Sequence, residues 1–363
     1  MRWLRKELFR KFLSAQILFL IGAIAVNQFY PEWAQFTIIG LILTESICFF
    51  LLVTRPLKKV LKEFKALLVG KNYNRIYTEK KDEIGVMAHF FNGVTKSLER
   101  VTAQIKAHRR LSSELNTARK IQQDVIPQKA PEIPGLDIMA KTKPAAELGG
   151  DAYSFLPQND QTFMYIGDVT GHGIPSGLVM MVVDTLIHTF IDQVRNGHEL
   201  LSLTNKYLKP RIQTTMFMTL MMLRYEHHDQ KLHYTGAGHE TLLHYKAKEG
   251  ICENIKGGGI ALGMVPDNTK LIKETHLPVE EGDFIVLYTD GIVEAKNETG
   301  EMYSIEQFRK LVEEEAPKAQ TAEELFNQLS TKVLHFLGDF TQEDDMTLLV
   351  IKKDARITVD ENK

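Results

Sequence analysis

Four short acidic motifs lie in the C-terminal two-thirds of this chain, and each sets an aspartate beside glycine or after an apolar run. They are Gly149-Gly150-Asp151, Gly167-Asp168-Val169-Thr170-Gly171-His172-Gly173, Tyr288-Thr289-Asp290-Gly291 and Asp344-Asp345-Met346-Thr347. Carboxylates gathered at one site repel one another, so such a site needs cations or protons to neutralise it. Oxygen ligands suit Mg²⁺ and Mn²⁺. The pattern predicts a site for hard divalent cations, although any single Asp-Gly pair is also typical of an ordinary turn.

Cysteine usage argues against other kinds of metal or redox site. The chain has only Cys48 and Cys252, far apart in the sequence. Zinc ribbons, disulfide frameworks and thiol redox motifs need cysteines or histidines at short spacing. None of these three is supported.

Two short apolar runs predict the strands that position the aspartates. The runs 163–166 and 284–288 are rich in β-branched or aromatic residues, as buried strands are. Asp168 and Asp290 then sit at strand ends, where neighbouring glycines let the backbone approach an ion closely. The segment 174–190 has Pro175 at its start and apolar residues all round, which predicts a buried helix.

Taken together, these motifs resemble the metal-dependent PPM-type serine/threonine phosphatases, and within them the bacterial SpoIIE-like, RsbU-like branch. The resemblance runs from about Leu111 to Lys352 in the family's order, and its further motifs are Glu147–Tyr153, Ala237-Gly238-His239, Leu262-Gly263 and Gly282–Gly291. It implies an α+β fold, in which a PPM phosphatase β-sandwich is flanked by helices on both faces (αββα).

The resemblance also implies a binuclear Mn²⁺ or Mg²⁺ centre that activates a water for attack on a phosphoester. Asp168 would bridge the two ions, with the backbone carbonyl of Val169 as a further ligand. Asp151 would serve one ion, and Asp290 and Asp344 the other.

Several residues near these motifs leave alternatives open. Asp345 is the weaker candidate ligand of its pair, and His239 is expected to be a turn residue near the site. His172 is a candidate general acid, but a loop histidine is more often a solvated polar group. Ser154 stands where many relatives carry another aspartate, which leaves the occupancy of one metal or of a third ion open.

Two apolar segments, 12–30 and 33–54, predict a membrane hairpin, because each can cross a bilayer core of about 30 Å. A cleaved signal peptide is the alternative for the first segment, but the second would still anchor the chain. Glu45 lies inside the second span, where a helix–helix hydrogen bond is favoured over a functional role. Basic residues flank both outer ends, so both termini of this multi-pass protein are expected on the cytoplasmic side of a bacterial inner membrane. They are Arg2, Arg5, Lys6, Arg10 and Lys11 before the hairpin, and Arg55, Lys58 and Lys59 after it.

The next segment resembles a HAMP domain, a helix pair that dimerises into a four-helix bundle. Arg55-Pro56 opens an amphipathic stretch, a glycine-bearing connector follows at 70–74, and Asp82-Glu83-Ile84-Gly85 starts a second stretch. The second stretch carries a coiled-coil seam through Met87, Phe91, Val94, Leu98, Val101 and Ile105. A generic stalk is the alternative. The apolar spacing shortens near His108, which suggests a switch element in the linker helix.

These observations predict five parts: a transmembrane hairpin (1–54), a HAMP domain (55–107), a linker or switch helix (108–130), a PPM-type phosphatase domain (131–354) and a polar tail (355–363). The formal net charge of −2 argues against a nucleic-acid partner. We expect a membrane-anchored protein serine/threonine phosphatase that dimerises through the HAMP and linker helices. The resemblance implies a phosphorylated STAS-type anti-sigma-factor antagonist as its substrate.

Two alternatives belong to other functional classes. A HAMP-linked histidine kinase would share the N-terminal part, but the chain has no His-Glu-x-x-x-Pro phosphoacceptor motif. An inactive phosphoprotein-binding scaffold would keep the fold without turnover. Ser154 is the feature that favours the scaffold, and the four retained aspartates argue against it.

Overall fold

The computed structural model describes residues 7–79, 82–239 and 241–354. The chain divides into two compact units, Met1–Leu111 and Ser112–Lys363. Arg2, Arg5, Lys6 and the predicted polar tail lie outside the described residues.

The first unit begins with long apolar helices. Its elements are α1 (Glu7–Phe29), a 3₁₀ turn (Pro31–Trp33), α2 (Ala34–Phe49), a π-helical turn (Phe50–Thr54) and α3 (Arg55–Leu68). The helical stretch Gln35–Leu68 is long and apolar enough to cross a membrane, and Leu13–Phe29 is a shorter apolar helix. The Gln16 side-chain amide donates a hydrogen bond to Glu45, as expected for an ionisable group between apolar helices. These helices are compatible with the predicted hairpin.

Helix α3 packs against the start of α4 (Glu83–Val125) around a small apolar core. The connector between them is tied to α4, because the Asn92 side chain donates to the Ile76 carbonyl at 2.9 Å and accepts from the Ile76 amide at 3.0 Å. Asp82 caps α4 by accepting from the Gly85 amide at 3.0 Å. The order of helix, connector and helix is the predicted one. Helix α4 continues without a break past His108.

The second unit contains two five-stranded antiparallel sheets. One, the β9 sheet, has the order β1-β10-β9-β6-β7, and the other, the β3 sheet, has the order β2-β3-β4-β5-β8. The strands are β1 (Leu136–Lys143), β2 (Ala152–Pro157), β3 (Gln161–Val169), β4 (Met218–Glu226), β5 (Lys231–Ala237), β6 (Thr241–Lys246), β7 (Ile251–Lys256), β8 (Glu274–Leu277), β9 (Phe284–Tyr288) and β10 (Met346–Lys353).

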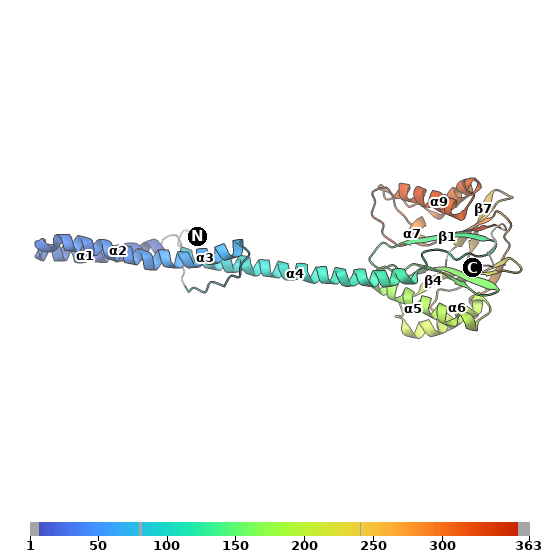
Figure 1. Cartoon of the computed structure of the whole chain (residues 1–363), viewed down its shortest axis with the longest axis horizontal. Coiled ribbons are helices and arrows are strands. Elements are labelled where there is room, and N and C mark those ends of the chain that lie inside the picture. Colours follow the sequence, from blue (N-terminus) through green and yellow to red (C-terminus); the bar gives the residue numbers. More distant parts are fainter. Residues whose placement is uncertain (1–6, 80–81, 240, 355–363) are drawn as a thin grey trace. The chain divides into compact units, whose positions relative to one another are not determined.

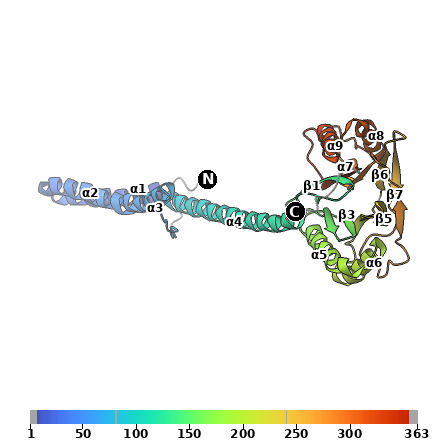
Figure 2. The same cartoon turned by 45° about the vertical axis from the view of Figure 1, so that its right-hand side comes forward.

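Helices cover the outer faces of both sheets (Figures 1 and 2). On the side of the β3 sheet lie α5 (Ile174–Phe190) and α6 (Gly197–Leu208). On the side of the β9 sheet lie α7 (Asp290–Val293), α8 (Ile305–Glu315) and α9 (Ala322–Leu337). Short 3₁₀ helices follow at Ile191–Gln193, Lys209–Arg211 and Ala316–Lys318. The predicted αββα sandwich is confirmed.

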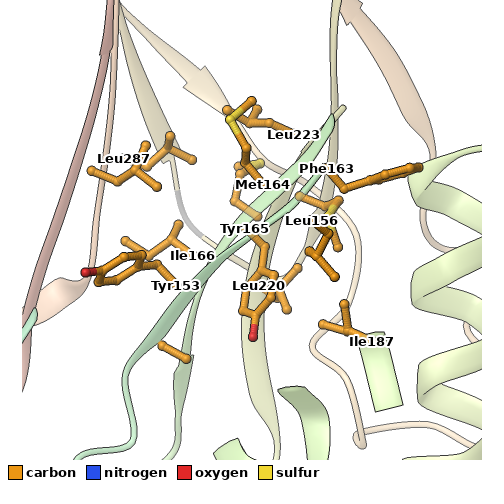
Figure 3. Close-up of a cluster of buried hydrophobic side chains, with 14 of the residues drawn as sticks. Tyr153, Leu156, Phe163, Met164, Tyr165, Ile166, Ile187, Leu220, Leu223 and Leu287 are labelled. Carbon is orange, nitrogen blue, oxygen red and sulfur yellow. The ribbon is translucent and has the colours of Figure 1, made fainter. Parts of the chain in front are cut away.

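Alternation along β3 supplies side chains to two different layers of the core. Ile166 and Tyr153 project to the side on which Leu287 of β9 lies, between the two sheets (Figure 3). Phe163 and Tyr165 project to the opposite side, toward Ile187 of α5. Because side chains alternate with a period of two, this pattern also fixes the direction of Asp168, which shares the side of Ile166.

Helix α5 has the predicted bounds but is buried on one face only. Met180, Val183 and Ile187 are inaccessible, whereas Leu178 is 59% exposed and belongs to an exposed stripe with Ile174 and Val182. The predicted buried helix is therefore buried on the face that meets the sheet and exposed on the other. Apolar composition all round a helix does not distinguish a helix buried on every side from one that covers a sheet.

Candidate active site

Asp151 and Asp168 come from neighbouring strands of the β3 sheet. Asp168 is the penultimate residue of β3 and lies opposite Thr219 of β4, and Asp151 directly precedes β2. Asp151 shares the side of Tyr153, as Asp168 shares that of Ile166, so both carboxylates face the other sheet. Because β2 and β3 are antiparallel, the start of β2 and the end of β3 bring the two aspartates to the same end of the sandwich.

Asp290 and Asp344 come from the β9 sheet. Asp290 is the first residue of α7, two residues after β9 ends, and Asp344 lies two residues before β10 begins. A Cβ at Gly291 would lie 2.0 Å from the carbonyl oxygen of Asp345. Only glycine therefore permits this approach of α7 to the Asp344 segment, which explains the Asp-Gly pair more specifically than a turn does.

Two threonines of the β9 sheet hold Asp151 from across the sandwich. The hydroxyls of Thr289 and Thr347 donate to the same oxygen, Oδ2 of Asp151, at 2.7 and 2.6 Å. The Thr347 amide in turn donates to the Thr289 hydroxyl at 2.9 Å. Both threonines belong to the acidic motifs of the sequence, but no role was predicted for them. The available signal was that each stands within three residues of a candidate ligand.

The carboxylates perturb each other strongly. Burial, followed by the charges of Asp151, Asp290 and Asp344, raises the pKa of Asp168 to about 9. Burial also raises the pKa of Asp151 to about 7, although the hydrogen bonds from Thr347 and Thr289 favour its charged form. Carboxylates with raised pKa values hold protons near neutral pH, and a bound cation would take the place of those protons.

The donor set fits divalent cations of the hard class. It consists of four carboxylates, and the Val169 carbonyl lies beside them, because a Cβ at Gly150 would come within 3.0 Å of its oxygen. All of these donors are oxygens, as Mg²⁺ and Mn²⁺ prefer. Across residues 7–79, 82–239 and 241–354, no three histidine, cysteine or acidic side chains are placed so that together they could hold a metal ion. The charges of Asp151, Asp290 and Asp344 act on Asp168, but the four aspartates do not form such a group.

The remaining predicted residues differ in their surroundings. Asp345 is buried, and both of its oxygens accept backbone hydrogen bonds. His172 is exposed on the loop before α5. His239 lies in the connection between β5 and β6, as expected of a turn residue, but it is buried there, and its Nδ1 lies 3.2 Å from the Thr219 hydroxyl. Ser154 is buried opposite Tyr165, on the α5 side of β2, and so faces away from the carboxylates.

A cavity of about 140 Å³ opens beside Asp344. Its lining includes Gly291, Glu294 and Lys296, and the Lys296 ammonium pairs with Glu343 at 2.7 Å. A larger cavity of about 680 Å³ lies beside α6 and is lined by none of the four aspartates. Of the four aspartates, only Asp344 lines the smaller cavity, so neither cavity by itself marks the carboxylate site.

Comparison with known proteins was consistent with this geometry. Residues 158–354 match the family described as stage II sporulation protein E (SpoIIE). The chain is 29% identical over 243 residues to the phosphoserine phosphatase RsbU of Bacillus subtilis (strain 168). The aligned region covers 67% of this chain and 71% of RsbU.

Solved structures share the fold. The SiaA-PP2C domain of Pseudomonas aeruginosa superimposes with a TM-score of 0.60 at 22% identity, covering 69% of this chain and 98% of that domain. The PP2C phosphatase domain of SpoIIE from Bacillus subtilis, with a fragment of its regulatory domain, gives a TM-score of 0.52 at 15% identity, covering 61% of this chain and 64% of that one.

Proposed function

The chain belongs to the SpoIIE family of PPM-type phosphatases, and we propose that it is a membrane-anchored, metal-dependent protein serine/threonine phosphatase. Its substrate would be phosphoserine or phosphothreonine on a regulatory protein of the STAS type. The phosphoserine activity in the name of RsbU supports the reaction. The STAS substrate follows from the resemblance to the RsbU-like branch.

The observation that carries this proposal is the meeting of four aspartates from two sheets at one end of the sandwich. Asp151, Asp168, Asp290 and Asp344, together with the Val169 carbonyl, would hold two divalent ions in the proposed centre. The ions would supply the acidity that makes a water nucleophilic near neutral pH and the charge that stabilises the phosphoryl oxygens. The chain's own contribution is to hold the carboxylates in place through Thr289, Thr347 and the strand ends.

Support for the membrane anchor and the dimer comes from the first unit. The apolar helices on either side of Pro31–Trp33 suit a hairpin with both ends in the cytoplasm. Within one chain, the seam residues Met87, Val94, Leu98, Val101 and Ile105 are each more than a third exposed. A parallel partner helix in a HAMP-type dimer would cover them.

Control would pass through the C-terminal end of α4. Gln122 on this helix is buried and contacts the backbone of Gly149, two residues before Asp151. Rotation or repacking of the linker helix would therefore move the Asp151 loop and change how well the site binds metal.

The test uses the full-length protein in lipid nanodiscs and a STAS-type protein phosphorylated on serine. Phosphate release would be measured with Mn²⁺, with Mg²⁺ and with a chelator, for the wild type and for Asp290→Asn. We expect release that needs metal and collapses in the variant. Stable binding of the phosphoprotein without phosphate release under any metal condition would instead identify the scaffold.

A further inference from the structure

Asp345 is held in an unusual way for a residue beside a metal site. The residue is 2% exposed, and each of its carboxylate oxygens accepts a hydrogen bond from a backbone amide of a distant segment. Oδ1 accepts from the Ala145 amide at 2.7 Å, and Oδ2 accepts from the Gly150 amide at 2.6 Å. Ion ligation by either oxygen would have to share that oxygen with an amide already bound to it.

These contacts connect the two halves of the carboxylate set. Gly150 directly precedes Asp151, and the Asp345 amide donates to Oδ1 of Asp344 at 2.8 Å. The carboxylate also packs closely on the glycine pair, since a Cβ at Gly149 would lie 3.0 Å from Oδ2 of Asp345.

Gln342 braces the same two segments at a second point. Its side-chain amide donates to the Lys143 carbonyl at 2.7 Å and to the Asp344 carbonyl at 2.8 Å. Two bracing side chains from the segment before β10 therefore hold the loop that leads to Asp151.

We propose that Asp345 is a positioning residue, which aligns the Asp151 loop with the Asp344 segment and thereby sets the spacing of the metal-binding carboxylates without ligating an ion. The proposal rests on the proposed metal-dependent function. Hydrogen bonds to an ionised carboxylate are stronger than those between neutral groups, so this contact can fix the loop firmly. Residues that orient metal ligands typically contribute about 10–100-fold to metal affinity.

The experiment is calorimetric titration of Mn²⁺ into the full-length protein in nanodiscs, with thermal unfolding of each variant as a check on folding. The variants are Asp345→Ala, Asp345→Asn, Asp345→Glu and Asp344→Asn. Asp283→Asn is the matched control, because Asp283 is also buried and accepts two backbone amides, those of Ala247 and Glu280, at the start of β9 and away from Asp344.

We expect Asp345→Ala to keep the Mn²⁺ stoichiometry of the wild type and to weaken affinity about 10–100-fold. Asp345→Asn keeps one hydrogen-bond acceptor and should weaken Mn²⁺ affinity less than Asp345→Ala does. Asp345→Glu keeps the charge but displaces the loop, so it should also weaken Mn²⁺ affinity. Asp344→Asn should lower the stoichiometry by one. Asp283→Asn should lower thermal stability and leave Mn²⁺ affinity unchanged.

Any one of four results would overturn the positioning role. Loss of one bound ion in Asp345→Ala would make Asp345 a ligand. If Asp345→Ala binds Mn²⁺ with wild-type affinity, or if Asp283→Asn weakens Mn²⁺ affinity equally, Asp345 has no specific role at the site. If Asp345→Ala and Asp345→Asn weaken Mn²⁺ affinity equally and Asp345→Glu binds Mn²⁺ as the wild type does, the negative charge of Asp345 matters and its position does not. A wild-type protein that binds no Mn²⁺ would overturn the proposed function itself.

Discussion

The imidazole of His239 donates a hydrogen bond from Nε2 to the carbonyl oxygen of Tyr288 at 2.9 Å. A carbonyl can only accept, so Nε2 carries the proton and Nδ1 accepts from the Thr219 hydroxyl. Thr219 lies opposite Asp168, and Tyr288 ends the strand that leads to Asp290. One neutral imidazole thus joins the two sheets directly behind the carboxylates.

This bridge predicts a specific loss of stability in acid. Burial lowers the pKa of His239 from 6.5 to about 4, although the hydrogen bond that His239 donates to the Tyr288 carbonyl acts in the opposite direction. As the pH falls, the unfolded chain takes up the proton first, so the stability contribution is complete above pH 6.5 and is lost progressively down to about pH 4. The loss over this window is about 3 kcal/mol. Urea unfolding followed by circular dichroism should show this slope in the wild type and a shallower one in His239→Gln. Identical slopes would contradict the assignment.

The two threonine hydrogen bonds to Asp151 predict that removing a single hydroxyl weakens metal binding. Thr347→Val keeps the shape of the side chain but deletes one of the two hydroxyl donors to Oδ2. We expect the Mn²⁺ concentration for half-maximal phosphatase activity to rise about 10–100-fold. Thr142→Val is the matched control, because its hydroxyl contacts Thr347 at 2.8 Å and is not bonded to Asp151. An equal effect of both variants would show that general packing is responsible.

The linker contact predicts coupling between α4 and the site. The Gln122 side chain donates to the Gly149 carbonyl at 2.8 Å and accepts from the Gly149 amide at 3.1 Å. Gln122→Ala leaves two buried backbone groups without these partners, at a cost of about 1–3 kcal/mol for each group. Phosphate release at limiting Mn²⁺ should fall at least tenfold and recover partly at high Mn²⁺. Gln123→Ala, at an exposed neighbouring position, should behave as the wild type.

The exposed seam predicts a dimer that a single charge disrupts. Leu98→Asp places a carboxylate on the apolar stripe of α4, where it would be buried against the partner helix. Lys96→Asp changes an exposed residue away from the seam and serves as control. Crosslinking in nanodiscs should yield dimers for the wild type and the control, and fewer for Leu98→Asp. Undiminished crosslinking in Leu98→Asp would argue against this interface.

Local sequence patterns predicted the strands and the helix around the site well. The apolar runs before Asp168 and Asp290 are β3 and β9, and α5 begins and ends at the predicted residues. These elements follow from periodicity and from glycine and proline positions, which are local properties of the chain.

The side-chain partners of the site could not be predicted in the same way. Thr289 and Thr347 lie 138 and 196 residues from Asp151 in the sequence, and only the packing of two sheets brings them together. The burial of His239 and the double backbone contact of Asp345 depend on the same packing. The exposed stripe of α5 was missed because composition does not tell which face of a helix meets a sheet.

Strand β2 forms one edge of the β3 sheet, and it ends at Pro157, just before the stretch that matches the family begins. A fragment cut at that boundary would retain all the matched residues but would lose Asp151 and uncover the backbone of β3. An unpaired strand edge invites pairing with other chains, so such a fragment should aggregate. Dissection of this enzyme for expression should therefore follow sheet topology and start before β1.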